Sequence, residues 1–395
     1  MKPLGLYLHI PFCVRKCAYC DFVSYPGRQD DIPRYLDALA QEFDWYRERG
    51  LFDVYAVQTV FVGGGTPSLA AEPLAAFFER FQETLLMNAV EVTVETNPGT
   101  IGLPGLQRLF QAGCRRLSIG VQSFHDRELR TLGRIHSAHD AEMCIEAARA
   151  AGFLNLSLDL MFGIPGSTLA NWEQTVQRAL DFAPEHISAY NLTIEDETPF
   201  GRQQQDGTLR LPDEETQLAM YDAVIAMLTA AGYEQYEISN FARPGYRSQH
   251  NPIYWRNEEY LGLGAAAYSY LGGYRYWNEV LLDVYMHKCG ELDSSRVTGA
   301  IHLELPYPST VVGQETLNVE AMMGETVMMC LRLCEGLNLA WFQQRFGQAF
   351  TRVYAPQIAR LTSDRLIELT PTHVRLTYRG LRLANDVLQH FLTLP

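Results

Sequence analysis

The sequence lacks the features that would carry a chain into or across a membrane. It has no run of about eighteen uncharged apolar residues, and residues 1–9 have neither the basic start nor the long apolar stretch of a signal peptide. We therefore expect a cytoplasmic protein.

Basic residues are also scarce. The chain has 32 Lys and Arg against 46 Asp and Glu, which gives a formal net charge of -14. Proteins that bind nucleic acids present clustered Lys and Arg to the phosphate backbone. We therefore expect no nucleic-acid partner, and we attribute the acidic excess to solubility.

Between residues 4 and 190, short β-rich runs alternate with amphipathic stretches, which is typical of parallel β/α units. We predict six strands, at 5–10, 57–62, 91–96, 116–121, 155–160 and 186–192. The helical patterns between them fall near 33–49, 72–87, 104–112, 139–151 and 168–182. The predicted fold class is α/β, a partial (β/α)6 barrel of the TIM type.

The tail of the chain has a different character. Helical patterns at 320–336, 340–347, 356–366 and 379–392 surround a predicted hairpin over 366–377. We expect a small α+β, winged-helix-like domain over 315–395, after a barrel domain with its extension over 1–300 and a linker at about 291–315. Because the tail carries no basic patch, we expect it to pack or dock rather than to bind DNA.

Three of the eight cysteines are clustered directly after the first predicted strand, as Cys13, Cys17 and Cys20. In a chain without an export signal, such spacing indicates metal or redox chemistry rather than disulfides. Three thiolates on one loop can hold three irons of a cubane and leave the fourth iron open for a ligand with amino and carboxylate groups. The alternative is a structural zinc site, which would need a fourth Cys or His, and residue 22 is Phe.

The loop IPFCVRKCAYCDF resembles the CxxxCxxC signature of the radical S-adenosylmethionine (SAM) superfamily. This resemblance implies a [4Fe–4S] cluster that cleaves SAM to methionine and a 5′-deoxyadenosyl radical. In β/α barrels the chemistry lies at the carboxyl ends of the strands. Polar residues stand at or near those ends here, and we expect them to converge on one pocket: Glu95, Gln122, Ser123, Asp159, Tyr190 and Asn191.

The same resemblance implies the residues that bind SAM. They are Tyr7, Tyr19, Gly64, Gly65, Thr66, Glu95, Gln122, Arg134 and Asp159. Several of them have an ordinary structural alternative: a turn for the glycines, a helix cap for Glu95, an exposed charge for Arg134, and packing for Tyr7 and Tyr19. We also expect His9, in the strand-one signature, to orient the cysteine loop.

The strings YLHIPFC, GGGTPS, VQSF and DLMFGIPG resemble the branch that contains oxygen-independent coproporphyrinogen III oxidases and HemW-type heme chaperones, over nearly the whole chain. The oxidases carry a fourth cysteine where this chain has Phe22, and a long segment before the cluster, where this chain has twelve residues before Cys13. Both departures favour the chaperones.

His250, Asn251, Tyr254 and Trp255 reproduce the HNxxYW motif that the chaperone family associates with heme. An imidazole can ligate heme iron, and aromatic rings offer a flat apolar surface to the macrocycle. The alternative is that Asn251 caps a helix that begins at Pro252, with Tyr254 and Trp255 in the core. Tyr268 stands where relatives have a histidine, so no role of that histidine is transferred.

The expected function is that of a heme chaperone, which binds heme, a [4Fe–4S] cluster and SAM, and transfers heme to an acceptor hemoprotein such as a respiratory cytochrome. The alternative is a radical SAM enzyme acting on a tetrapyrrole, such as the coproporphyrinogen oxidase. We expect SAM cleavage but not oxidase activity, a monomer or homodimer, and transient membrane contact only through the acceptor. Cys330 and Cys334 we interpret as core thiols.

Overall fold

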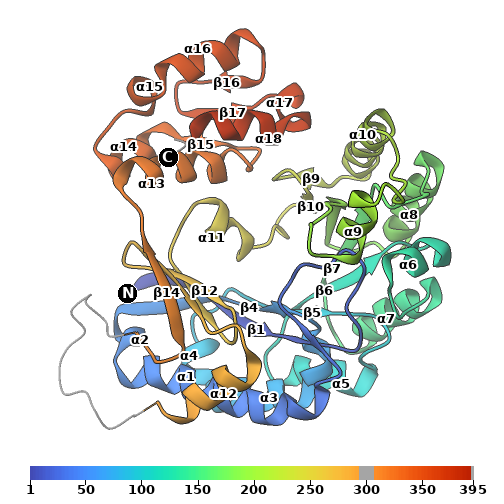
Figure 1. Cartoon of the computed structure of the whole chain (residues 1–395), viewed down its shortest axis with the longest axis vertical. Helices are drawn as coiled ribbons and strands as arrows, with labels where there is room; N and C mark the ends of the chain where they lie inside the picture. The colour runs from blue at the N-terminus through green and yellow to red at the C-terminus, as the bar shows by residue number, and fades with distance from the viewer. Residues whose placement is uncertain (293–306, 393–395) are drawn as a thin grey trace.

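The computed structural model describes residues 1–292 and 307–392. It confirms the six predicted parallel strands, which lie side by side in chain order (Figure 1). They are β1 (Lys2–Ile10), β4 (Tyr55–Gly64), β5 (Glu91–Thr96), β6 (Arg116–Gln122), β7 (Asn155–Phe162) and β8 (His186–Asn191).

Helices connect these strands and pack outside them. Those of the barrel and its extension are α1 (Ile32–Glu48), α2 (Leu51–Val54), α3 (Ala71–Arg80), α4 (Gln82–Leu85), α5 (Leu103–Gln111), α6 (Asp126–Leu132), α7 (Ala138–Ala150), α8 (Leu169–Asp181), α9 (Pro199–Gln205), α10 (Glu214–Ala230), α11 (Asn251–Trp255) and α12 (Leu282–Gly290). Ser137, Thr168 and Asp213 cap α7, α8 and α10, because each side chain accepts an N–H from the residue three positions on. In the described part of the chain no helix has the length and apolarity to span a bilayer.

The barrel interior is polar, and strand β6 shows how the sequence produces this. Leu117, Ile119 and Val121 belong to the main hydrophobic core. The alternate positions, among them Arg116, Ser118 and Gln122, line an internal cavity. Since successive strand residues point to opposite faces, the apolar set packs outward and the polar set faces the lumen.

The sheet continues beyond the six expected strands to twelve. On the β1 side, β11 (Tyr260–Leu263) pairs in parallel, followed by antiparallel β12 (Tyr268–Leu271), β13 (Tyr274–Asn278) and β14 (Val311–Thr316). On the β8 side, β10 (Asn240–Ala242) and β9 (Glu234–Gln235) are antiparallel. The predicted linker over 291–315 is therefore wrong at its end, because residues 311–315 pair with β13; residues 293–306 lie outside the described residues.

Helix α11 lies across the amino ends of the strands. Glu91, the first residue of β5, accepts N–H groups from Gln249 at 2.9 Å and His250 at 3.3 Å. Thr59 of β4 bonds His250 and pairs in register with Glu91. These contacts hold α11 at the lower end of the barrel lumen. Three residues of α11 line the internal cavity of the barrel, and we call them the floor residues: Asn251, Tyr254 and Trp255.

The tail forms a small α+β unit with its own hydrophobic core. Its helices are α13 (Val319–Cys330), α14 (Leu339–Phe346), α15 (Phe350–Val353), α16 (Ala355–Ser363), α17 (Tyr378–Arg382) and α18 (Ala384–Leu388). The predicted hairpin is β16 (Ile367–Leu369) with β17 (His373–Leu376), and a third strand, β15 (Leu337–Asn338), joins β17. Figure 1 shows this unit in orange and red, with α11 between it and β1 and β4.

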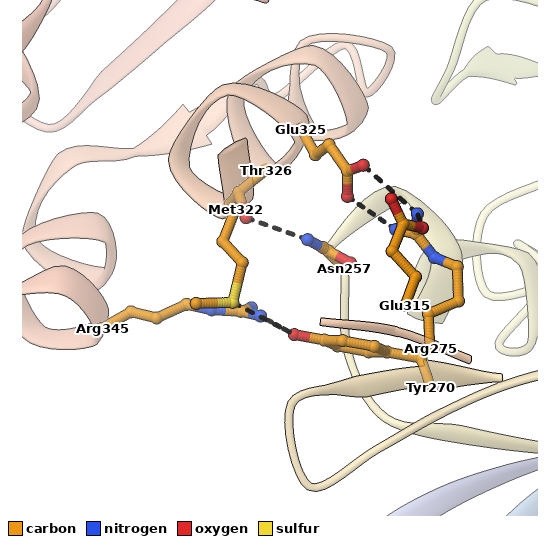
Figure 2. A network of polar contacts seen from close by, with 8 residues as sticks. All are labelled: Asn257, Tyr270, Arg275, Glu315, Met322, Glu325, Thr326 and Arg345. Carbon is orange, nitrogen blue, oxygen red and sulfur yellow. Dashed lines mark hydrogen bonds and ion pairs between the residues drawn. The ribbon is translucent and has the colours of Figure 1, made fainter. Parts of the chain in front are cut away.

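Polar contacts join the tail to the sheet extension (Figure 2). Arg275 of β13 pairs with Glu325 of α13 at 2.6 Å and with Glu315 of β14 at 3.2 Å. The Asn257 side-chain amide donates to the Thr326 hydroxyl at 3.0 Å, and both residues are buried. Because buried polar pairs depend on correct placement, they fix the tail against the residues that follow α11.

Candidate active site

The cysteine loop leaves the carboxyl end of β1 and is held from several sides. A short parallel pair, β2 (Phe12–Cys13) and β3 (Tyr25–Pro26), brackets it. Within the loop, the N–H of Ala18 donates to the Leu132 carbonyl, and the Ala18 carbonyl accepts from the N–H of Phe200, both at 3.0 Å. Cys13 is buried, and Cys17 and Cys20 are half-buried. Backbone hydrogen bonds thus connect the cysteine loop to α6 and α9.

His9 orients the loop, as expected. Burial lowers the pKa of its imidazole to about 4, so the ring is neutral at pH 7. Nε2 lies 3.0 Å from the Val23 carbonyl and must donate to it, which leaves Nδ1 to accept from the Tyr7 hydroxyl at 2.9 Å. Tyr7 and His9 therefore hold the end of the loop that follows Cys20.

The glycines at the end of β4 allow that strand to approach the loop closely. A Cβ on Gly65 would lie 2.7 Å from the Phe12 carbonyl oxygen and 3.0 Å from Cys13 Sγ. Gly64 has φ +113°, and its Cβ would lie 2.6 Å from the His9 ring. Gly64 and Gly65 are more than an ordinary turn, because a side chain at either position would displace His9 or the cysteine loop.

A chain of polar contacts reaches two of the sulfur atoms. The Thr66 hydroxyl lies 3.5 Å from Cys13 Sγ, and Arg134 Nη1 lies 3.7 Å from Cys17 Sγ. Asn97 joins the two, because its amide donates to Thr66 Oγ1 at 2.9 Å and its carbonyl oxygen accepts from Arg134. Arg134 is thus a partly buried site residue rather than an exposed charge. Sequence reasoning missed Asn97, although it stands only two positions after Glu95.

An internal cavity of about 510 Å³ brings the predicted site residues together. Its lining includes Cys13, Cys17, Tyr19, Cys20, Gly64, Gly65, Thr66, Glu95, Gln122, Arg134, Asp159 and Tyr190. Two of the six polar residues that were expected to converge on one pocket lie outside this cavity. Ser123 bonds the buried Glu128, and Asn191 lines a neighbouring cleft. Tyr7 also faces that cleft.

Several buried polar atoms of cavity-lining residues have no hydrogen-bond partner within the protein, among them Thr96 Oγ1, Gln122 Oε1 and Arg134 Nε near the carboxyl ends of the strands. Buried polar groups are costly unless they are paired. An amino acid derivative with hydroxyl, amino and carboxylate groups, such as SAM, carries the complementary donors and acceptors.

Two carboxyls face the same lumen. Burial, reinforced by the nearby Asp159, raises the pKa of Glu95 to about 8, although Glu95 accepts the Gly64 N–H at 3.2 Å. Burial also raises the pKa of Asp159, which lies within β7 rather than at its end and accepts the Ser118 hydroxyl at 2.9 Å. Two neighbouring acids favour a ligand that brings positive charge or hydroxyl donors. Glu95 is thus a lumen residue and not a helix cap.

An aromatic cleft of about 650 Å³ opens beside the cavity. Its rings are Tyr7, Tyr19, Phe22, Tyr190, Tyr254, Tyr260 and Tyr268. Phe22 is 69% exposed and Tyr268 is 50% exposed, so flat apolar surface is available there. Tyr19, Cys20, Phe22, Met161, Tyr190 and Tyr254 line both spaces, which places the cleft directly next to the cysteine loop.

Comparisons with known proteins agree with this geometry. The radical SAM superfamily profile matches residues 7–179, and the HemN C-terminal domain profile matches residues 317–383. The heme chaperone HemW of Bacillus subtilis (strain 168) is 37% identical over 98% of both chains, and that of Lactococcus lactis subsp. lactis (strain IL1403) is 33% identical over 99% of this chain and 98% of its own. This chain belongs to the HemW family.

The HemW-family chain has a close structural counterpart. The Escherichia coli coproporphyrinogen III oxidase HemN, described as a radical SAM enzyme, superposes with a TM-score of 0.81 at 25% identity, over 99% of this chain and 90% of its own. The expected superfamily, fold class and porphyrin-related branch are therefore confirmed.

The structure gives the surroundings of the HNxxYW motif in this HemW-family chain. His250 is fully buried, with Nδ1 2.7 Å from Thr59 Oγ1, Nε2 2.8 Å from the Tyr254 hydroxyl, and its ring stacked on Phe61. Both ring nitrogens are engaged, so His250 cannot present a nitrogen to heme iron in this arrangement. Asn251 is not the helix cap either, because α11 begins at Asn251 and His250 precedes it.

Proposed function

We propose that this protein is a heme chaperone that binds heme, a [4Fe–4S] cluster and SAM, and transfers heme to an acceptor hemoprotein such as a respiratory cytochrome. The observation that carries the proposal is the aromatic cleft that shares a wall with the cavity of the cysteine loop. The HemW relatives that match over the whole chain, each named a heme chaperone, support it.

Cys13, Cys17 and Cys20 would hold the cluster, which when bound supplies the electron that cleaves SAM. Among the described residues, no three His, Cys, Asp or Glu side chains meet closely enough to hold a single metal ion. A cubane takes each thiolate on a different iron, so the sulfur atoms need not meet at one point. The contacts of Thr66 and Arg134 with two of the sulfurs would stabilise negative charge there.

The lumen residues would position SAM. Glu95 and Asp159 would accept hydrogen bonds from its amino and ribose hydroxyl groups, while Gln122 and Arg134 offer polar atoms that have no partner in the protein. Gly64 and Gly65 leave the backbone at the end of β4 accessible to SAM, and Thr66 lines the cavity directly after them. The rings of Tyr7 and Tyr19 would close the space near Cys20.

Heme would lie on the aromatic cleft, with the floor residues Asn251, Tyr254 and Trp255 contacting it from the lumen. Aromatic rings stack on a flat macrocycle through large apolar contacts. In this assignment His250 contributes indirectly, because its contacts with Thr59 and Tyr254 hold the Tyr254 ring in the wall shared by cleft and cavity. We keep the two-domain division, 1–300 and 315–395, a cytoplasmic location and a monomeric or homodimeric state as parts of the proposal.

A second candidate is a radical SAM enzyme that acts on a tetrapyrrole, such as oxygen-independent coproporphyrinogen III oxidase. The fold likeness to HemN along 99% of this chain favours it. Phe22, exposed in the cleft where the oxidases carry a cysteine, favours the chaperone.

The test is anaerobic reconstitution of the full chain with iron and sulfide, followed by two assays. Heme titration followed by absorbance should show saturable binding, and incubation with coproporphyrinogen, SAM and a reductant should yield no protoporphyrinogen. Conversion to protoporphyrinogen would refute the chaperone proposal in favour of the oxidase. Cys13→Ser should lose the cluster iron, whereas Cys334→Ser, a thiol of the tail unit, should retain it.

A further inference from the structure

Arg116 is a buried cation: its charge acts on the Asp159 carboxyl, but Arg116 forms no ion pair with that or any other carboxylate in the described part of the chain. It is 3% exposed, begins β6, and lines the lower part of the lumen together with the floor residues. Its Nε has no hydrogen-bond partner, and within residues 1–292 and 307–392 it makes no ion pair. A buried guanidinium without a directly paired anion is unfavourable, so the site is incomplete as the protein alone provides it.

The histidines near Arg116 do not alter this charge. His186 bonds Ser157 Oγ at 2.7 Å through Nδ1 and the Tyr236 hydroxyl at 2.8 Å through Nε2. Burial, with Arg116 as the second cause, lowers the pKa of His186 far below its usual value and that of His250 to about 3. Both rings are therefore neutral at pH 7, and Arg116 remains the permanent charge of the floor.

The floor offers further donors. Trp255 Nε1 is buried without a partner, while the Arg332 guanidinium lies 4.6 Å from the centre of the Trp255 ring. The Asn251 side chain lines the same cavity. A guanidinium, an indole N–H and an amide make a donor set that suits a carboxylate.

We propose that the floor is a carboxylate-binding subsite, in which Arg116 receives a propionate group of the bound tetrapyrrole, with Trp255 Nε1 and Asn251 as further donors. The proposal rests on the proposed heme function and specifies how that ligand is held. A SAM carboxylate is the weaker candidate, because β6 spans about 20 Å from Arg116 to Gln122 and the cysteine loop lies at the Gln122 end. The aromatic cleft, in contrast, extends from that loop to the floor residue Tyr254, which lines both the cleft and the cavity of Arg116.

The test compares hemin with hemin dimethyl ester, whose propionates carry no charge, by absorbance titration of the reconstituted protein. The wild type should bind hemin at least about tenfold more tightly than the ester, as expected for a charge-assisted contact. Arg116→Gln should abolish this preference by weakening hemin binding alone. Trp255→Phe, which keeps the ring but removes the N–H, should reduce it.

Arg332→Gln is the matched control, since it removes a guanidinium that contacts the Trp255 ring but lines a different cleft, and it should keep the full preference. Arg116→Lys should restore part of it, and iron content with thermal melting checks that each variant folds. An Arg116→Gln protein that keeps its preference for hemin, or that loses only SAM affinity, would overturn the subsite. Binding of neither hemin nor ester by the wild type would overturn the heme function itself, and the subsite with it.

Discussion

Glu95 is a side chain that the fold holds in an unfavourable setting. Burial and the neighbouring Asp159 raise its pKa from 4.5 to about 8, so below about pH 8 the folded protein keeps a proton that the unfolded chain has released. Between these two values the unfolded state binds fewer protons, and stability must fall as pH rises, by about 1.4 kcal/mol per pH unit for one such group. A loss of folding stability of this kind is common at ligand-binding sites, where the residues are selected for function rather than for stability.

Glu95→Gln should therefore stabilise the ligand-free protein, and by more at pH 8 than at pH 5, because the amide carries no charge to desolvate. Thermal melting across this pH range measures the difference. The same variant should bind SAM more weakly. Glu83→Gln, at an exposed glutamate, is the control and should leave the pH profile unchanged. Equal gains in melting temperature at both pH values would contradict the raised pKa.

His250 should act as a support and not as an iron ligand. His250→Gln keeps hydrogen-bonding capacity toward Thr59 and Tyr254, so we expect heme bound to this variant to show the wild-type absorption and spin-state spectrum, with a lower melting temperature. A spectrum that reports the loss of an axial nitrogen would contradict the arrangement of the floor.

At this scale the sequence predicted most of the cavity wall, because a motif and its strand position place a side chain reliably. It could not predict that Thr59, 191 positions away, engages one nitrogen of His250. Asn97 and Arg116 were missed for a related reason. Asn97 and Arg116 stand next to or at strand ends, where polar residues are common, and only the folded barrel places their side chains in the cavity.

At the scale of elements, the end of β4 controls the geometry of the cysteine loop. Gly65→Ala should prevent cluster assembly, because its Cβ would lie 2.7 Å from a backbone oxygen of Phe12 that cannot move without the loop. Iron and sulfide analysis after reconstitution measures the loss. Gly290→Ala, where a Cβ meets nothing within 4 Å, should assemble the wild-type cluster. Full iron content in Gly65→Ala would show that the loop adapts.

The periodic elements were predictable, and the short ones were not. The six β/α units have long apolar alternations, which identify a strand or helix locally. Strands β9 and β10 have only two and three residues, and β10 and β14 pair with strands that lie more than 30 residues earlier in the chain, so no local pattern identifies them. For this reason a segment rich in Ser, Thr and Pro was expected to be a linker up to residue 315, although Val311–Thr316 completes the sheet.

At the scale of the whole molecule, Arg275 connects the sheet extension to the tail unit. Its side chain and that of Glu325 are about three-quarters buried, so their pairing is less screened than a surface ion pair. Arg275→Met should lower the free energy of unfolding by about 1–3 kcal/mol, since it leaves partly buried carboxylates without a partner. Denaturant unfolding measures this.

The exposed pair Arg375–Glu368 within the tail provides the comparison. Arg375→Met should cost less than about 1 kcal/mol. Equal losses in the two variants would mean that the Arg275 contacts contribute no more than an ordinary surface pair.

The pairing of β1 with β11 has a consequence for the order of events during synthesis. The cysteine loop leaves the ribosome about 240 residues before Leu263, the end of the strand that flanks β1 on its outer side. The Tyr35 hydroxyl, which donates to the His9 carbonyl, accepts the N–H of Ala265 and gains this contact only after Ala265 has been synthesised. At about 5–20 residues per second the nascent cysteines spend roughly 10–50 s without this wall. We therefore expect the cluster to assemble after the chain is complete. The three thiols must stay reduced during the interval between their synthesis and that of β11.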